Sequence, residues 1–503
     1  MARKGLAVLQ VGLLVLGMLS AVLSVPAGTV EAPGPVPCPG KISSWKGSQT
    51  LRSDTPEPLS PCPGMEWVKT YDGPLAERGT SILPTADGGY VVLGEADTAV
   101  PGAQDVWVLK LNETGVVEWE RTYGGPGRER PQEILATADG GYLVLSSTSS
   151  FGPNPSVNTM NAWIFKLDAS GDILWQNAYG GTKQDLLFDI ASTPDGGFIA
   201  AGGSDSHRTG SGYWWDVADA WVVKLDASGN VAWQKAYGVS ATGECASGVQ
   251  PTPDGGYIVA GSKVPSNGLP ELWVFKVSSS GSIAWQKIYG VGYGGQLCAE
   301  FMANNPDVVT TPDGGYFVTA ITLYNAYYAT DGWIYKLDSA GNVVWRRGWG
   351  TSSEEWFVAT DKTSDGGYVM VGVGRELGPN AIWVVRIDSA SNLVWKKLYS
   401  MSGASAAVYG NGAVRQTSDG GFVLTGGWSS GGLLVMKLDG DGFAGVCTDP
   451  GIGVNSNAVL TESRRGPLGN NNAKAATPAT SMTTASGTFA ATSASVSQQC
   501  TSW

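Results

Sequence analysis

Four consecutive residues in one insertion of the sequence, Tyr213, Trp214, Trp215 and Asp216, combine aromatic rings with a carboxylate. Aromatic planes beside a carboxylate suit stacking on sugar rings with hydrogen bonds to hydroxyls, and they equally suit a protein-contact patch. The alternative is that both tryptophans only pack against their own loop. Corresponding connections further along the chain add more members to this candidate binding set: Tyr324, Tyr327, Tyr328 and Trp428.

Acidic side chains recur between the repeated segments of the chain. They are Glu77, Glu129, Asp185, Asp189, Glu244, Glu300, Asp307, Glu354 and Glu355. A glycosidase needs two carboxylates at a defined separation and calcium needs clustered oxygen ligands, but sequence spacing establishes neither across separate segments. No Asp-x-Asp-x-Asp-Gly loop is present. We therefore expect a solvated acidic rim.

The overall composition excludes several classes of function. One histidine in 503 residues leaves little room for chemistry that depends on imidazole. The formal net charge of -12 argues against a phosphate-binding surface, so nucleic acid is excluded as a partner. The sequence therefore predicts no catalytic residue, no metal ligand and no cofactor; an enzymatic role is left open, with a non-catalytic one favoured.

The N-terminus resembles an export signal. A short basic stretch at 1–4 precedes a largely apolar segment at 5–25, which favours secretion; Lys4-Gly5-Leu6 leaves a pilin-like signal with a retained helix as the alternative. No second apolar run of 18 or more residues follows, so the mature chain has no membrane span unless that helix is kept. We expect an extracellular or cell-surface protein.

Six cysteines form an even set, which in an exported chain favours disulfides. Cys245 and Cys298 follow equivalent tyrosines in neighbouring repeats, so we predict that they form one bridge. The pairing of the other four cannot be read from spacing: they are Cys38, Cys62, Cys447 and Cys500. Asn112 begins the sequence Asn-Glu-Thr, which makes it a predicted glycosylation acceptor in a hairpin turn.

A repeat covers most of the chain. Asp-Gly-Gly followed by an aromatic residue occurs seven times, and these motifs begin at Asp87, Asp139, Asp195, Asp254, Asp313, Asp365 and Asp419. About twenty residues later in each repeat comes a strand of the type Trp-x-x-Lys-Leu-Asp, and then a glycine and a second tryptophan strand. This last element follows only six of the repeats. Its seventh copy, around Trp67, lies ahead of the first Asp-Gly-Gly.

Each repeat reads as four short strands. In the first repeat they are expected at 80–85, 90–95, 105–111 and 116–122, with alternating apolar residues and glycine-containing turns. Four-stranded units of this period are typical of propeller blades. The fold class is therefore all-β, a single seven-bladed β-propeller, with the strand around Trp67 completing the last blade and removing its open edge. The repeated aspartates, lysines and tryptophans are expected to be scaffold residues.

The repeated motifs also carry a resemblance to known proteins. The succession Tyr-Gly-Gly, Asp-Gly-Gly-Tyr, Asp-x-Trp-x-x-Lys-Leu-Asp-x-x-Gly and x-x-x-Trp is similar to the seven-bladed repeats of exported bacterial and archaeal surface proteins. The segment 224–233 also resembles the tryptophan-docking motif of quinoprotein dehydrogenases. That second resemblance implies blade packing only, because this chain has seven units and no cofactor constellation.

These inferences give a domain plan and a functional hypothesis. We expect a signal peptide or pilin-like helix at 1–27, an irregular segment at 28–64, the propeller at 65–447 and a Ser/Thr/Ala/Asn-rich tail at 448–503. Weak alternation at 488–496 leaves a strand that pairs with an exposed edge as an option for the tail. The predicted function is a binding or structural module for extracellular protein or glycan partners. The alternatives are an extracellular carbohydrate-active enzyme and a self-associating subunit of a filament or surface layer.

Overall fold

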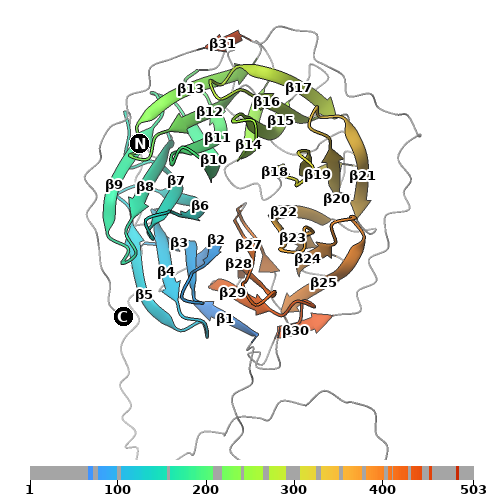
Figure 1. Cartoon of the computed structure of the whole chain (residues 1–503). Coiled ribbons are helices and arrows are strands. Elements are labelled where there is room, and N and C mark those ends of the chain that lie inside the picture. Colours follow the sequence, from blue (N-terminus) through green and yellow to red (C-terminus); the bar gives the residue numbers. More distant parts are fainter. Residues whose placement is uncertain are drawn as a thin grey trace, which may run out of the picture. The chain divides into compact units, whose positions relative to one another are not determined.

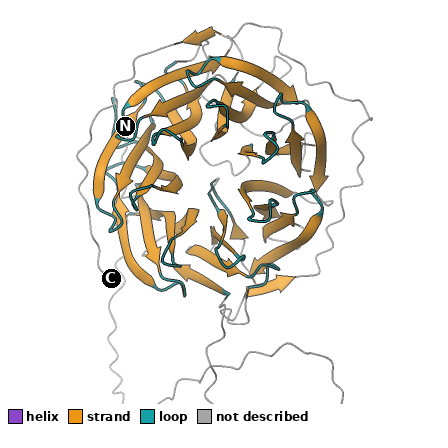
Figure 2. Ribbon diagram, viewed as in Figure 1, coloured by secondary structure: helices purple, strands orange, loops and turns teal. Residues whose placement is uncertain are grey.

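The structure is a computed structural model of the whole chain, and its described residues all belong to one unit, Pro63–Trp503. The described residues are 66–71, 77–98, 103–153, 155, 159–207, 218–238, 243–263, 271–289, 306–323, 330–349, 355–375, 381–401, 406–410, 412–428, 432–444, 452–455 and 483–485. Within these ranges every regular element is a strand (Figure 2). No helix in them is long and apolar enough to cross a membrane.

Consecutive strands of one repeat pair as antiparallel hairpins. Their bounds are β1 (Trp67–Tyr71), β2 (Glu77–Pro84), β3 (Tyr90–Asp97), β4 (Gln104–Leu111), β5 (Val117–Tyr123), β6 (Glu129–Ala136), β7 (Tyr142–Thr148), β8 (Asn161–Leu167), β9 (Ile173–Tyr179), β10 (Asp185–Ser192), β11 (Phe198–Ser204), β12 (Asp219–Leu225), β13 (Val231–Gly238), β14 (Glu244–Pro251), β15 (Tyr257–Lys263), β16 (Glu271–Val277), β17 (Ile283–Tyr289), β18 (Asp307–Thr310), β19 (Tyr316–Leu323), β20 (Thr330–Leu337), β21 (Val343–Trp349), β22 (Glu355–Lys362), β23 (Tyr368–Gly374), β24 (Ala381–Ile387), β25 (Leu393–Met401), β26 (Ala406–Ala407), β27 (Val414–Gln416), β28 (Phe422–Trp428), β29 (Leu433–Leu438), β30 (Ile452–Asn455) and β31 (Thr483–Ala485).

Four-stranded antiparallel sheets are the building unit, as the repeat predicts. The groups β2–β5, β14–β17 and β18–β21 are each one such sheet, and β22–β25 is extended by β30. The runs β6–β9 and β10–β13 are two more, joined into a larger sheet by a single parallel pairing of Asp185 with Asn161, with β31 beside β13. These sheets are the blades of a β-propeller, and neighbouring blades surround a common axis (Figure 1).

The remaining sheet combines both ends of the repeat region. Its inner part is β26 and β27, followed by β28 and β29, and its outer strand is β1. β1 pairs antiparallel with β29, with Trp67 opposite Lys437 and Tyr71 opposite Leu433. The first strand of the described chain therefore lies beside the last strand of the repeats (Figure 1).

The Asp-Gly-Gly turns are held by the same contacts in every repeat. In the first repeat Gly88 has a φ of 84°, which a side chain would strain, and Asp87 accepts hydrogen bonds from the Thr85 hydroxyl at 2.5 Å and from the Gly89 N–H at 3.0 Å. A cation from the third strand then pairs with the aspartate. The seven pairs among the described residues are Lys110–Asp87, Lys166–Asp139, Lys224–Asp195, Lys276–Asp254, Lys336–Asp313, Arg386–Asp365 and Lys437–Asp419.

These ion pairs lower the pKa of the aspartates. The Lys166 ammonium and the Thr137 hydroxyl hold the pKa of Asp139 at about 2. The threonine, the aspartate and the cation of the third strand occur together in each repeat. The aspartates are therefore structural groups that fix the turn to the third strand. The expectation of a scaffold role for the repeated Asp and Lys residues agrees with these contacts.

Tryptophans of the outer strands pack on the next blade. The ring of Trp119 lies so close to Gly171 that a Cβ there would be 3.1 Å from it, and Gly171 has a φ of 82°. In the same junction the Tyr123 hydroxyl donates to the Gly171 carbonyl at 2.6 Å. Six tryptophan–glycine pairs of this kind lie in the described residues: Trp67–Gly115, Trp119–Gly171, Trp175–Gly229, Trp233–Gly281, Trp285–Gly341 and Trp395–Gly442.

One junction is built differently. Ser391 stands where the others have glycine, and with a φ of 67° it is the non-glycine residue in the left-handed region among the described residues. Trp349 stands where the others have the tyrosine, and the Arg347 guanidinium donates to the Ser391 carbonyl in its place. The junction therefore keeps the hydrogen bond to the turn with a different donor.

The hydrophobic core lies between neighbouring blades. One buried cluster, for example, joins Leu145 and Ile164 of β7 and β8 to Trp221 and Val223 of β12. Trp163, Trp221, Trp273 and Trp383 on the third strands are fully buried. The core is thus distributed around the ring, and each blade depends on both neighbours for burial of its two faces.

Candidate functional site

The structure leaves most of the predicted binding set untested. Tyr213, Trp214, Trp215 and Asp216 lie outside the described residues, as do Tyr324, Tyr327 and Tyr328. Trp428 is the last residue of β28, where it pairs with Ala406. Whether these side chains come together therefore stays a prediction.

The same holds for most of the cysteines. Cys245 lies in β14 and is buried, whereas Cys298 and the four terminal cysteines lie outside the described residues. We expect non-reducing peptide mapping to recover Cys245 and Cys298 in one linked peptide, because both lie just after equivalent outer strands of adjacent repeats. Recovery of either cysteine linked to another position would contradict this pairing.

Asn112 lies in the turn between β4 and β5, as predicted. Its side-chain oxygen accepts hydrogen bonds from the Thr114 N–H at 3.0 Å, the Thr114 hydroxyl at 2.9 Å and the Val116 N–H at 2.9 Å. The asparagine therefore also organises the turn. Its glycosylation stays a prediction.

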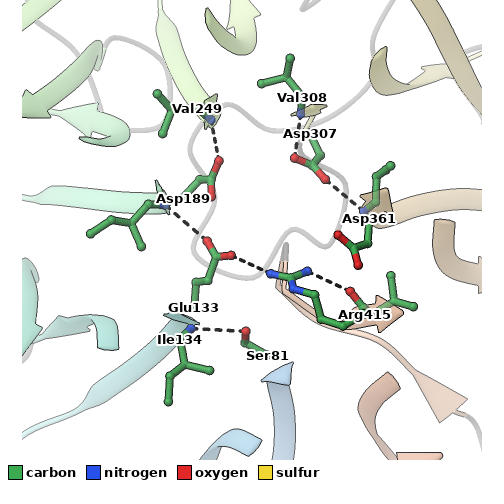
Figure 3. Close-up of polar contacts among 12 residues, drawn as sticks. Ser81, Glu133, Ile134, Asp189, Val249, Asp307, Val308, Asp361 and Arg415 are labelled. Atoms are coloured by element: carbon green, nitrogen blue, oxygen red, sulfur yellow. Dashed lines mark hydrogen bonds and ion pairs between the residues drawn. The ribbon is translucent and has the colours of Figure 1, made fainter. Parts of the chain in front are cut away.

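A polar cluster around the propeller axis was not foreseen as a unit. We call Ser81, Glu133, Asp189, Asp307 and Arg415 the axial cluster (Figure 3). Ser81, Glu133 and Asp189 each directly follow a bulge in the inner strands β2, β6 and β10. A bulge re-aims the next side chain, which explains why a polar residue at this position points away from the apolar core.

The side chains of the axial cluster bond the backbone of the next inner strand. Ser81 accepts from the Ile134 N–H at 3.3 Å, Glu133 from the Ile190 N–H at 3.4 Å, Asp189 from the Val249 N–H at 2.5 Å and Asp307 from the Thr360 N–H at 3.0 Å. These groups therefore act as links between blades, because each accepts a hydrogen bond from a buried backbone donor of the next inner strand.

The other inner-strand junctions use different atoms for the same purpose. The Ser247 hydroxyl donates to the Pro306 carbonyl at 2.7 Å, and the Gln416 N–H donates to the Asp361 carboxylate at 3.0 Å. Between the last and first repeats, the Ile82 N–H donates to the Gly412 carbonyl at 3.0 Å. Hydrogen bonds thus connect the inner strands in succession through β2, β6, β10, β14, β18, β22 and β27.

Arg415 supplies the positive charge of the axial cluster. Its guanidinium pairs with Glu133 at 3.1 Å and donates to the Val414 carbonyl at 2.8 Å. Burial opposes the charge of Arg415, but the carboxylates around it outweigh that effect and raise the pKa of the guanidinium. A cation from β27 is therefore fixed among acids from several other blades.

Two carboxyl groups of the axial cluster hold their protons more strongly than usual. Burial, and then the charge of Glu133, raise the pKa of Asp307 to about 7 and raise that of Asp189 well above its usual range. Both side chains are almost fully buried. Burial therefore favours the protonated forms of these two acids, which are enclosed by backbone donors and by the other acids of the cluster.

The expectation of a solvated acidic rim is wrong for the described residues that it named. They are all less than a tenth exposed: Glu77, Glu129, Asp185, Asp189, Glu244, Asp307 and Glu355. Asp185, for example, accepts from the Ser204 hydroxyl at 2.5 Å and the Gly181 N–H at 2.7 Å, and Glu244 pairs with Lys263 at 2.6 Å. Protein donors therefore replace water around Asp185 and Glu244. Glu300 and Glu354 lie outside the described residues.

One pair of acids lies at the strand ends that carry the long connections. Asp105 is the second residue of the third strand of one blade, and Glu129 begins the first strand of the next. Burial, and then the charge of Glu129, raise the pKa of Asp105 to about 6. Glu129 accepts from the Thr148 hydroxyl at 2.8 Å and the Gly125 N–H at 3.2 Å. Sequence reasoning missed Asp105 because it forms part of the repeated Asp-x-Trp strand.

The chemistry open to these acids is limited in the part of the chain that the structure describes. No group of three or more His, Cys, Asp or Glu side chains there is arranged to hold a metal ion. The axial acids are too deeply buried to touch a substrate. Their arrangement is that of an interblade hydrogen-bond network.

No protein-family model matches the chain. Similar solved structures include an α-L-arabinanase from Penicillium chrysogenum, with 12% identity and a TM-score of 0.43 over 75% of this chain and 98% of that one. An ulvan lyase has 8% identity and a TM-score of 0.44 over 74% and 97%, and Semaphorin 1b from Drosophila has 9% and 0.38 over 74% and 87%.

One curated relative is similar in sequence. It is the regulatory protein FlaEY of Caulobacter vibrioides, 25% identical over 243 residues, which are 43% of this chain and 25% of the relative. The chain therefore spans about a quarter of the length of the curated relative that it matches.

Proposed function

We propose that this protein is a secreted or cell-surface seven-bladed β-propeller that binds extracellular protein or glycan partners and makes no use of its repeated charged residues in catalysis. The observation that carries this proposal is the engagement of the repeated aspartates and lysines in the same turn contacts in every repeat. A catalytic group would be expected at one or two asymmetric places instead.

The blade number and the closure of the ring belong to this proposal. They are supported by the pairing of β1 with β29, by the docking of Trp67 on Gly115, and by hydrogen bonds between successive inner strands. The basic and apolar N-terminal sequence supports export, and the repeat motifs support membership of the group of seven-bladed exported surface proteins.

Recognition is proposed for the long connections. In each repeat the Asp-Gly-Gly turn and the turn after the third strand occupy one end of the blade, so the connections at the other end are free to vary. The segment 213–216 belongs to the longest of these in its repeat, between β11 and β12. Its two adjacent indoles offer the large contact area that commonly dominates binding energy.

A double substitution tests this assignment. We expect Trp214→Ala with Trp215→Ala to weaken the partner interaction by about 2 kcal/mol or more while leaving the melting temperature unchanged. A glycan array and a panel of immobilised surface proteins would identify the partner on the native protein, and titration calorimetry would give its affinity for both forms. Leu174→Ala, which changes an exposed apolar residue of β9, is the matched control.

The outcomes separate three explanations. Undiminished affinity with a lower melting temperature would show that the two tryptophans only pack their own loop. Release of reducing sugar from a bound polysaccharide would support the carbohydrate-active enzyme, for which the raised pKa of Asp105 beside Glu129 is the favouring observation. Concentration-dependent assembly of the purified protein would support the filament or surface-layer subunit.

A further inference from the structure

A groove lies at the junction between the third and fourth four-stranded sheets, at the end of the blades that carries the Asp-Gly-Gly turns. It has a volume of ≈ 320 Å³. Its wall includes Asp195 and Lys224 from one sheet, Trp233 from the outer strand of that sheet, and Thr252 and Tyr257 from the next. This volume is at the lower end of the range for small-molecule sites, which suits a single ring.

The local sequence explains why this junction is open. The residue before the docking tryptophan is Ala232, and it is exposed and lines the groove. Leu174, Val344 and Val394 occupy the same position in three other repeats, Glu66 and Glu118 in two more, and Ala284 at the next junction. The small side chain at 232 therefore leaves more room beside the docking tryptophan than a leucine or valine would.

The aromatic wall of the groove is held in place. The Trp233 and Tyr257 rings have centroids 6.0 Å apart and an interplanar angle of 56°. The Trp233 indole N–H donates to the Ser279 carbonyl at 2.9 Å, which fixes the ring but leaves it only half-buried. A fixed and partly accessible indole face is a surface on which the C–H face of a sugar ring can stack.

The polar groups of the groove are a carboxylate, an ammonium and a hydroxyl. Asp195 Oδ1 accepts from Thr193, from the Gly197 N–H and from the Lys224 ammonium at 3.1 Å, whereas Oδ2 pairs with the same ammonium at 2.9 Å and keeps capacity for a further donor. The Asp195 side chain is largely exposed. The Tyr257 hydroxyl makes no hydrogen bond to any described residue, so it can donate to and accept from a ligand.

The charge balance of the groove selects between two kinds of ligand that stack on indole. An organic cation would meet the Lys224 ammonium beside Asp195, which offsets the attraction of the carboxylate. A neutral ring that carries hydroxyls can bond the carboxylate and the phenol hydroxyl without adding charge. The balance of groups therefore favours a neutral, hydroxyl-rich ligand over a cation.

We propose that this groove binds a pyranose ring of a neutral glycan, with the ring stacked on Trp233 and its hydroxyls bonded to Asp195 and Tyr257. This inference rests on the proposed function and names a ligand class for it. It places a glycan site at the opposite end of β12 from the segment 213–216, because Asp219 begins that strand and Leu225 ends it.

A groove-filling variant tests the proposal without removing the docking tryptophan. Ala232→Leu introduces the residue that the chain already has at 174, so the blade is expected to fold normally. We expect saturation-transfer NMR on the full chain to show contact with the ring protons of cellobiose, maltose or lactose, and Ala232→Leu to weaken that binding about fivefold or more.

The matched control is Ala284→Leu, the same change at the next junction. There Thr310 replaces Pro251, and the Lys362 ammonium donates to the Thr310 hydroxyl at 2.9 Å, so the surroundings differ. Binding is expected to survive this control. Sugar binding that survives Ala232→Leu, or that is lost only in Ala284→Leu, would overturn the groove assignment and leave the proposed function standing.

Two further results would also overturn the inference. Tighter binding of tetramethylammonium than of the sugars, with loss in Ala232→Leu, would make the groove a cation site. Absence of transfer to all three sugars would remove neutral glycans as its ligands. The proposed function would then still be decided by the partner screen and by the Trp214 and Trp215 substitutions, which act at the other end of the blade.

Discussion

Deletion of residues 1–72 is expected to leave a protein that aggregates or unfolds. The deletion removes β1, and with it the outer partner of β29 and the docking of Trp67 on the first blade. It also removes the hydrogen bonds from the Lys69 ammonium to the Thr114 carbonyl and from the Tyr71 hydroxyl to the Gly115 carbonyl, both 2.7 Å long. An unpaired strand edge and a bare interblade surface would then face solvent.

The matched control for this deletion is removal of residues 1–62, which keeps β1. Both proteins would be compared by size-exclusion chromatography and by thermal unfolding, with the shorter deletion expected to match the full chain. The single substitution Trp67→Ala is expected to cost about 3–5 kcal/mol, since the ring is buried at the junction. A 1–72 deletion that stays monomeric with an unchanged melting temperature would refute closure by β1.

Replacement of the axial cation is expected to cause the second large loss. Arg415→Met would leave the buried Glu133 carboxylate without its 3.1 Å partner, and breaking a buried ion pair in this way costs about 3–5 kcal/mol. Urea unfolding of the native chain and the variant would measure the difference. The effect is expected to be large because the remaining charges near Arg415 are also acidic.

A second substitution separates the ion pair from simple loss of packing. In the Arg415→Met background, Glu133→Gln removes the unpaired negative charge of the carboxylate while keeping an acceptor for the Ile190 N–H. We expect the double variant to recover much of the stability lost in the single one. Additive losses in the resulting double-mutant cycle would show that Arg415 and Glu133 are not coupled.

The sequence predicts the bounds of the second and third strands of the first repeat well, and the start of its first strand less well. In the first repeat the second strand is expected at 90–95 and found at β3 (Tyr90–Asp97), and the third is expected at 105–111 and found at β4 (Gln104–Leu111). The first strand, expected at 80–85, begins earlier, at Glu77. Glycine residues mark the short turns at one end of the blade, so the strand bounds next to those turns can be predicted. The longer connections at the other end have no such glycine turn, so the sequence does not mark where the next strand begins.

The repeat pattern also conceals where one junction departs from the others. Regularity predicts glycine at 391 and tyrosine at 349, and the chain has Ser391 and Trp349. The replacement donor, Arg347, lies on β21 and reaches the Ser391 carbonyl. A guanidinium on an outer strand has no sequence signature that marks it as a substitute for a phenol hydroxyl, so only the structure identifies it.

The contacts within the axial cluster could not be predicted from the sequence, for a different reason. Asp189 and Asp307 are recognisable as acids between repeats, but Glu133 and Arg415 are joined across 282 positions of sequence. Their meeting depends on the bulge before Glu133 and on the ring geometry that brings β27 beside the first blades. The sequence also cannot distinguish a buried acid with backbone donors from a solvated one, which is why the predicted rim is wrong.

The pairing of β1 with β29 constrains the order in which the chain can fold. Among the described residues β1 is the first strand to be made, and its partner is the last strand of the repeats. The strands between them can form hairpins locally, but β1 must wait until almost the whole repeat region has been synthesised. Closing so long a loop carries a large entropic cost and makes the final pairing a slow, non-local event. The sheet that contains β1 and β29 is therefore completed in one late step, and before that step the chain carries two complementary unpaired edges.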